Sequence, residues 1–147
     1  MSRRSAREAA VKIIFQNEFV DQRLMTEEGA IGETLDAESM LAMYLNSISE
    51  EDAEKLETKY VLDVLEGVPG LIQEIDGFIL ANSKDWTLDR MAKMDLAILR
   101  VAIYEMKYMP DIPVSVSINE AVELAKQFSY PEAAAFVNGV LGSVSRQ

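Results

Sequence analysis

Four basic residues and one aromatic residue near the start of the chain could together contact nucleic acid: Arg3, Arg4, Arg7, Lys12 and Phe15. In a helix with 100° between successive residues, Arg4 and Phe15 fall on one face together with Glu8 and Val11, and Arg7 and Lys12 flank it. Guanidinium and ammonium groups neutralise phosphates, and an aromatic ring offers a surface on which an unpaired base can stack. The pattern therefore favours a contact with single-stranded RNA.

A second interpretation of this face needs no ligand. Amphipathic N-terminal helices with a few basic residues are common, and Phe15 could simply pack beneath a later helix while the arginines are solvated. The residues alone leave both interpretations open. The opposite side of the predicted helix over residues 4–20 is expected to pack inward through its small and aliphatic side chains, Ala6, Ala9, Ala10, Ile13, Ile14 and Val20.

The net charge of the whole chain argues against a general nucleic-acid binder. Its 147 residues include 14 basic and 25 acidic side chains, a formal net charge of −11 that repels phosphate. The distribution is uneven, because residues 1–12 hold four basic side chains against Glu8 alone, whereas residues 24–59 hold ten acids against Lys55 and Lys59. The acidic stretch is typical of a solvated face or of a docking surface for a basic partner.

The composition excludes several kinds of active site. The chain has no cysteine and no histidine, which rules out disulfides, thiolate metal ligands, a cysteine nucleophile and the Ser-His-Asp triad. Glu120 and Glu123 lie one helical turn apart and could hold a cation, but Glu120 is better explained as a capping residue. We therefore expect no enzyme, no cofactor and no metal. With no apolar run near the roughly 18 residues of a membrane span and no secretory signal, a cytoplasmic location is expected.

Apolar side chains recur with a helical period through most of the chain, and no alternating pattern competes with it. Residues 95–108 are apolar on nearly every side, which predicts a central helix covered by its neighbours. We expect Asp95 to cap its first turn, and Arg100, Glu105 and Lys107 to form a thin edge that reaches water. The predicted fold class is all-α.

Further helices are expected on both sides of the central one. They should cover residues 40–48, 49–67, 71–80 and 88–94, with Pro69 ending or resetting the second of them. Ser117 and Glu120 match the S-x-x-E capping box, which predicts a helix start at Ser117. Pro131 is expected to open the last helix, whose inner stripe is Phe136, Val137, Val140, Leu141 and Val144.

Motifs spread over nearly the whole chain carry a resemblance to a known family. They are residues 3–10 (RRSAREAA), 88–90 (LDR), 95–100 (DLAILR), Tyr104-Glu105, Ile112-Pro113, 118–126 (INEAVELAK) and 136–141 (FVNGVL). Together they resemble the bacterial transcription antitermination factor NusB family. The resemblance implies one all-helical domain over residues 1–147, a bundle of about seven helices in two small sub-bundles, at about 1–82 and 83–147.

The same resemblance implies a non-catalytic RNA-binding factor. Such a factor binds the box A element of nascent RNA together with NusE, a ribosomal small-subunit protein, and helps RNA polymerase resist termination on ribosomal RNA operons. The family's arginine-rich motif falls on Arg3, Arg4 and Arg7, with Lys12 beside it, and its helix-one aromatic falls on Phe15. Its acidic positions near RNA and NusE fall on Asp95 and Glu132.

Several expectations about partners follow. The acidic chain suits a basic ribosomal protein, so we expect the RNA surface to be shared with NusE. Apolar surface that a partner normally covers could pair two copies into a homodimer. The chain departs from the family pattern at Phe128-Ser129, where Phe-Gly is frequent, and at residues 133–135, which are alanines where relatives often carry polar or basic side chains. A contact from residues 133–135 is therefore in doubt.

Two other functions compete with this interpretation. One is a helical scaffold that binds only proteins. The other is a stand-alone relative of the N-terminal domain of ribosomal RNA cytosine methyltransferases, which the same helical pattern resembles. This chain lacks a glycine-rich cofactor loop and a cysteine, so it cannot perform that methyl transfer alone.

Overall fold

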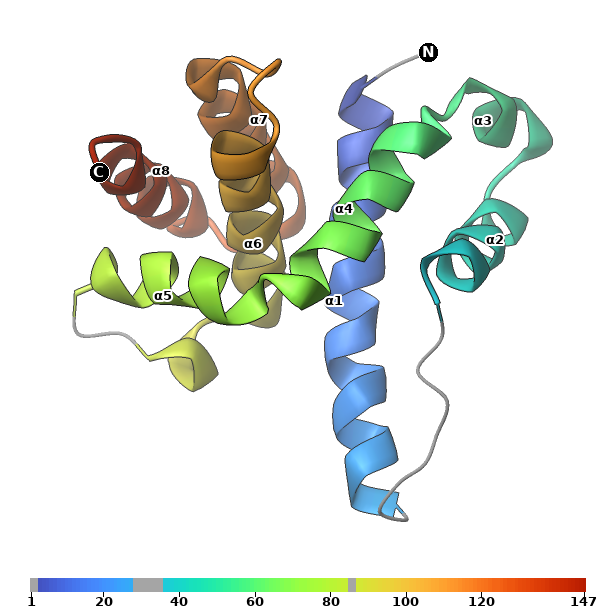
Figure 1. The fold of residues 1–147 in the computed structure, drawn as a ribbon, viewed down its shortest axis with the longest axis horizontal. Coiled ribbons are helices and arrows are strands. Elements are labelled where there is room, and N and C mark those ends of the chain that lie inside the picture. The colour runs from blue at the N-terminus through green and yellow to red at the C-terminus, as the bar shows by residue number, and fades with distance from the viewer. Residues whose placement is uncertain (1–2, 28–35, 85–86) are drawn as a thin grey trace. The chain divides into compact units, whose positions relative to one another are not determined.

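The computed structural model describes residues 3–27, 36–84 and 87–147. Within these ranges every regular element is helical, with eight α-helices and one short 3₁₀ helix, η1 (Figure 1). This confirms the all-α fold class. The chain divides into two compact units, Met1–Glu66 and Gly67–Gln147, and helix α4 (Thr58–Gly70) crosses the division. None of the described helices is long and apolar enough to cross a membrane.

The first unit is built on α1 (Arg3–Glu27), which packs against α2 (Ala37–Ser47). Asp36 caps α2 by accepting the Ser39 N–H at 2.7 Å, and Ser49 caps α3 (Glu50–Lys55) by accepting the Asp52 N–H at 3.1 Å. The predicted helix start at Ser49 is therefore confirmed. The core of this unit consists of small and aliphatic side chains with one tyrosine, Ala6, Ala9, Ala10, Val11, Ile13, Ala37, Leu41, Leu56, Tyr60, Val61, Val64 and Leu65.

Two details of the first unit differ from the sequence-based expectation. The predicted helix over residues 49–67 is two helices, because α3 ends at Lys55 and α4 begins at Thr58. Val11 was expected on the mixed outer face of α1, but it is 1% exposed. The inward side of α1 is thus wider than the apolar pattern indicated, since α2 and α4 both lie beside the helix (Figure 1). Val20 lies in α1, and its side chain is outside the described part of the structure.

In the second unit α6 (Lys93–Tyr108) is the central helix, as predicted. All side chains of residues 95–105 are buried. Helices α5 (Ile72–Ala81), α7 (Val114–Phe128) and α8 (Ala133–Ser145) each contact α6 (Figure 1). A helix that is apolar on nearly every side can bury every side only when neighbours cover it in this way.

Two charged residues of α6 correct the expectation of an edge that reaches water. Arg100 donates from Nε and Nη2 to the two carboxylate oxygens of Asp76 on α5, both at 2.9 Å. Glu105 is 1% exposed and accepts a hydrogen bond of 2.8 Å from the Ser117 hydroxyl on α7. Lys107 is half-buried, with its ammonium 4.7 Å from the centre of the Phe78 ring. Arg100 and Glu105 are therefore paired with protein groups and do not form an edge that reaches water.

The predicted caps of α6 and α7 are wrong. The cap of α6 is Ala92, which makes no side-chain cap bond, and Asp95 lies inside the first turn. Helix α7 begins at Val114 directly after Pro113, so Ser117 is already in the helix. A proline fixes the backbone angle that a helix start requires, and the Ser117 hydroxyl is taken by the buried Glu105. The S-x-x-E pattern here therefore lies within a helix.

Both prolines expected at helix ends lie close to such ends. Pro69 is in the last turn of α4, which ends one residue later, and Leu71 separates α4 from α5. Pro131 precedes α8, which begins at Ala133, two residues beyond the expected position. Its predicted inner residues Val137, Val140, Leu141 and Val144 are buried, and Phe136 is half-buried. The predicted helix over residues 88–94 is the short η1 (Leu88–Arg90).

Gly67 provides a test of packing in the second unit. A Cβ at this position would overlap the ring and hydroxyl of Tyr104, which is itself buried at 7% exposure. We expect Gly67→Ala to destabilise the protein by about 2 kcal/mol, as overpacking of a core does. Urea denaturation measures the change. Gly77→Ala on α5, where a Cβ meets nothing within 4 Å, should instead stabilise by roughly 0.5 kcal/mol. Equal effects of the two substitutions would contradict this account.

Candidate nucleic-acid interface

Arg3 and Arg4 are exposed in the first turn of α1. The Arg3 guanidinium donates from Nε and Nη2 to the Glu57 carboxylate, at 2.7 and 2.8 Å. Such two-pronged pairs have the geometry with which arginine also binds phosphate. Glu57 thus occupies the groups of Arg3 that a phosphate would use.

Tyr60 lies beside Arg3 and Arg7. The guanidinium carbons of the two arginines are 5.2 and 5.8 Å from the centre of its ring, within the range of cation–π contacts. Arg7 is only 4% exposed and Tyr60 is 2% exposed. The sequence placed Arg7 on the outer face, but the structure buries it, so its charge lies behind the surface that Arg3 and Arg4 present.

Lys12 and Phe15 lie further along α1. The Lys12 ammonium is 3.1 Å from the Glu8 carboxylate one turn before it, and the Phe15 ring is half-buried. The structure therefore brings Arg3 and Arg7 together at Tyr60, while Lys12 belongs to a different part of the same helix. The five predicted RNA-binding residues share α1, but they differ in how much of each side chain a ligand can reach.

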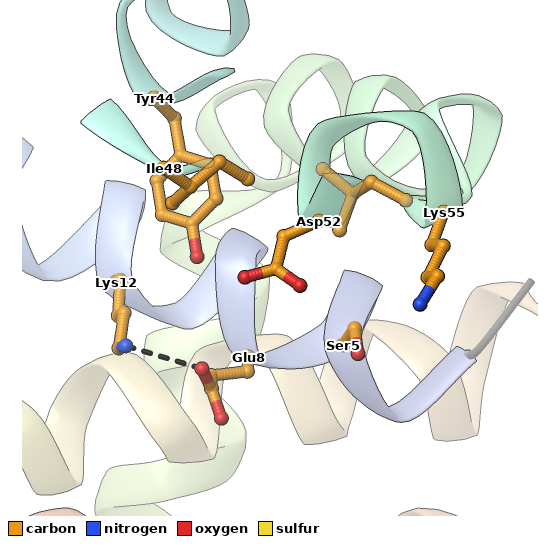
Figure 2. Close-up of a pocket in the computed structure, with 8 residues that line it drawn as sticks. Ser5, Glu8, Lys12, Tyr44, Ile48, Asp52 and Lys55 are labelled. Carbon is orange, nitrogen blue, oxygen red and sulfur yellow. Dashed lines mark hydrogen bonds and ion pairs between the residues drawn. The ribbon is translucent and has the colours of Figure 1, made fainter. Parts of the chain in front are cut away.

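A cavity of about 590 Å³ lies between α1 and the α2–α3 segment (Figure 2). Ser5, Glu8 and Lys12 line it from α1, and Tyr44, Ile48 and Asp52 line it from the other side. Burial raises the pKa of the Tyr44 hydroxyl above its usual value; the Lys12 charge opposes the rise, and the Glu8 and Asp52 charges add to it. Tyr44 is therefore protonated at neutral pH and can donate a hydrogen bond.

Glu57 reduces the positive charge available at the start of α1. The hydrogen bonds from Arg3 hold the pKa of the Glu57 carboxyl below its ordinary value of 4.5. Because the folded-state pKa is lowered, the pair stabilises the fold above the ordinary value, and that contribution is lost as pH falls through the lowered one. At neutral pH Glu57 is ionised and competes with any anion for Arg3.

The roles of Glu57 and Tyr60 could not be recognised from the sequence. Both lie more than fifty residues from the arginines that they contact, and Tyr60 has the spacing of an ordinary inward-facing residue of a helix. Only the packing of α4 against α1 brings these groups to the arginine-rich segment.

The chain was compared with known proteins. A family model described as the NusB family matches residues 4–146. The chain belongs to the NusB family. The transcription antitermination protein NusB of Acetivibrio thermocellus is 44% identical over 144 residues, which cover 98% of this chain and 88% of that protein. The protein of the same name from Natranaerobius thermophilus is 40% identical over 147 residues, covering 100% and 96%.

Solved structures of the NusB family share this fold. The structure of T. maritima NusB has a TM-score of 0.77 and 28% identity, covering all of this chain and 92% of that one. A second structure, of the antitermination factors NusB and NusE in complex with dsRNA, has a TM-score of 0.72 over 98% of this chain and 96% of its match. The sequence identity is 18%, so this similarity supports the fold alone.

The two acidic positions carried over from the NusB family lie in the second unit and differ in exposure. Glu132 is exposed just before α8. Asp95 is fully buried, and its Oδ1 accepts a hydrogen bond of 2.6 Å from the Ser129 hydroxyl. The Ser129 hydroxyl satisfies one oxygen of the buried carboxylate, and the other oxygen, Oδ2, has no hydrogen-bond partner among the described residues. Asp95 thus fixes the segment that precedes α8.

Tyr130 connects these two acidic residues. Its ring is 43% exposed, and its pKa is raised by partial burial and then by the negative charges of Asp95 and Glu132. Tyr130 therefore presents a protonated hydroxyl beside an acidic residue at the surface of the second unit. Sequence reasoning did not select it, because an aromatic residue before a proline in a loop has no distinctive pattern. Among the described residues, no cluster of three or more acidic side chains could hold a metal ion.

Proposed function

We propose that this chain is a non-catalytic transcription antitermination factor that binds box A RNA together with NusE and supports transcription of ribosomal RNA operons. The observation that carries the proposal is the exposed Arg3–Arg4 pair at the start of α1, in a chain that is otherwise acidic. The curated relatives bear the name of this function. Transcription by RNA polymerase takes place in the cytoplasm of bacteria, so the factor acts there.

In the proposed binding step, an RNA phosphate replaces the Glu57 carboxylate as the partner of Arg3. The phosphate takes the paired donors of Arg3 from Glu57, and Arg4 and Lys12 neutralise further phosphates along the strand. The half-buried Phe15 ring offers an edge or face on which an unpaired base can stack. Buried Arg7 acts through Tyr60, because it keeps that ring in place beneath Arg3.

NusE is the proposed protein partner, because the acidic surface of this chain suits a basic protein. A net charge of −11 attracts a basic ribosomal protein and repels RNA in general, so a strand is held well only where the two proteins share it. In the second unit, exposed Glu132 and Tyr130 are the direct contacts, and buried Asp95 positions them.

Fluorescence anisotropy of labelled box A RNA, titrated with the protein at two salt concentrations, tests the proposal. We expect salt-sensitive binding that NusE strengthens and that a scrambled RNA of equal length loses. Equal affinity with and without NusE would contradict the shared surface. Absence of binding in both cases, from a folded sample, would leave a scaffold that binds only proteins.

Glu57→Gln is expected to raise the affinity for box A RNA about threefold, because it weakens the competition for Arg3 and removes a negative charge near the strand. The same anisotropy titration measures this gain. Glu54→Gln is the matched control, since it removes one exposed charge from the neighbouring α3 without a contact to Arg3. An equal gain in the two variants would mean that total charge alone is responsible, and that no exchange takes place at Arg3.

A further inference from the structure

The cavity between α1 and the α2–α3 segment shares only Lys12 with the phosphate contacts described above. Its volume of about 590 Å³ lies within the range of sites that hold small organic ligands. Figure 2 shows the Tyr44 hydroxyl and the Asp52 carboxylate directed into the space above α1, with Glu8 and Ser5 on the opposite side. All of these groups belong to the first unit.

The lining of the cavity combines flat apolar surface with a few polar groups. The Tyr44 ring, Ile48 and Leu56 supply the apolar part. Asp52 accepts hydrogen bonds, and Tyr44 is held in its protonated form and donates one. A nucleobase has the complementary character, since its two faces are apolar and its edges carry donors and acceptors.

The position of the cavity links it to the proposed RNA surface. Glu8 lies one helical turn after Arg4, and Lys12 lies one turn after Glu8, so the outer face of α1 leads from the exposed arginines to the rim. A strand held at Arg3 and Arg4 would pass this rim. Lys12 and Lys55 both line the cavity, where Lys12 is paired with Glu8 at 3.1 Å and Lys55 with Glu51 at 3.0 Å. A backbone phosphate at the rim would compete with these two carboxylates for the lysines.

We propose that this cavity binds one unpaired nucleotide of the RNA, with the base against the Tyr44 ring and its N–H groups on the Asp52 carboxylate. The proposal rests on the proposed function, because the nucleotide belongs to the strand that α1 binds. It adds a site of sequence recognition to a surface that otherwise contacts phosphates, which carry no sequence information, and stacks a base on Phe15, which any base can do.

The chemistry of Asp52 selects among the bases. An ionised carboxylate only accepts hydrogen bonds, and its two oxygens match two adjacent donors. Guanine presents such a pair on one edge, the N1–H and the 2-amino group, whereas uracil presents one imino N–H between two carbonyl oxygens. The cavity therefore prefers guanine. Inosine, which lacks the 2-amino group, should bind more weakly than guanosine.

The direction of the change in affinity distinguishes a specific hydrogen bond to Asp52 from a nonspecific effect of charge. Removing an acidic residue from this chain should raise its affinity for any RNA or nucleotide, because repulsion falls. Asp52→Asn should instead lower the affinity for a guanine nucleotide, because an amide cannot accept both hydrogen bonds. Glu54→Gln on the same helix, which does not line the cavity, provides the matched loss of one charge.

The first experiment titrates the isotope-labelled full chain with guanosine, inosine and uridine 5′-monophosphates and follows backbone amide signals by NMR. We expect shifts at Tyr44, Ile48 and Asp52, with the guanosine nucleotide binding most tightly. Asp52→Asn should weaken guanosine binding about tenfold and abolish its preference over inosine, while Glu54→Gln keeps both. Shifts confined to other residues, or an unchanged preference in Asp52→Asn, would overturn the proposal.

The second experiment separates this site from the proposed function by repeating the box A anisotropy titration with both variants. If the nucleotides fail to bind the cavity while wild-type protein binds box A RNA, the cavity proposal fails and the antitermination role stands. If the guanosine nucleotide binds as described while box A RNA does not, the site stands as a nucleotide site and the antitermination role fails. Weaker box A binding by Asp52→Asn than by Glu54→Gln supports both.

Discussion

Reversing the two exposed charges at the start of α1, Arg3→Glu with Arg4→Glu, is expected to lower the affinity for box A RNA about 100-fold at low salt. Each arginine lost removes a phosphate contact, and each introduced carboxylate repels the strand. The dependence of the logarithm of affinity on the logarithm of salt should become shallower by about 1.4, or about 0.7 for each phosphate contact on a single strand. Anisotropy titrations over a salt series measure both changes.

The control for this variant keeps the total charge change and moves it to the second unit. Lys84→Glu with Lys126→Glu alters two exposed lysines outside α1. An equal loss of affinity in the control would show that net charge is responsible and that α1 has no special role. Arg7 is left unchanged in this test, because it is buried against Tyr60 and its reversal would report on folding.

Asp76→Ala is expected to destabilise the protein by about 3 kcal/mol, the largest stability effect that we predict for a single substitution. The Arg100 and Asp76 side chains are 10% and 15% exposed, so the substitution leaves a mostly buried guanidinium without its carboxylate. Breaking one partner of a buried ion pair costs far more than the pair contributes in net terms. Urea denaturation followed by circular dichroism measures the free energy of unfolding.

A paired replacement distinguishes the cost of an orphaned charge from a loss of packing. Asp76→Leu combined with Arg100→Met removes both charges, and we expect it to recover most of the stability lost in Asp76→Ala. Asp111→Ala, at an exposed position of the second unit, should change stability by less than about 0.5 kcal/mol. A loss below roughly 1 kcal/mol for Asp76→Ala would mean that water solvates Arg100 as it does at a surface pair.

Helices could be predicted from the sequence where the pattern of their own residues, or of their immediate neighbours in the chain, determines them. The central helix follows from apolar side chains around its whole circumference, and the inner stripe of α8 follows from the spacing of Val137, Val140, Leu141 and Val144. In both cases the residues that carry the pattern are the residues that the fold buries. The start of α3 at Ser49 was also predictable, because a cap involves only neighbours in the chain.

Features that depend on distant partners could not be predicted. Arg100 and Glu105 were expected at a polar edge because their partners, Asp76 and Ser117, lie on other helices. Ser117 and Glu120 have the spacing of a capping box, but Pro113 starts α7 earlier and the serine serves Glu105. A local motif is compatible with either use of the hydroxyl, and packing decides between them.

The role of α1 in RNA binding stays a prediction. The spacing of Arg4 and Phe15 placed them on one face of the first helix, with Arg3 in the basic segment just before it, and the structure leaves all three at least partly exposed. The spacing could not show that Arg7 is buried, or that the Arg3 guanidinium is already paired with the Glu57 carboxylate. Both features depend on how α4 packs against α1. The cavity could not be predicted from the sequence either, since its residues come from three separate helices.

Because α6 is buried, hydrogen exchange at its backbone amides reports the stability of the second unit. With every side chain of residues 95–105 buried, these amides should exchange with deuterium only when the whole unit opens. Their exchange rate therefore reports the opening free energy of Gly67–Gln147 separately from that of Met1–Glu66. A ligand bound to the first unit alone leaves the rate unchanged unless the two units open together, so slower exchange upon addition of RNA would measure their coupling.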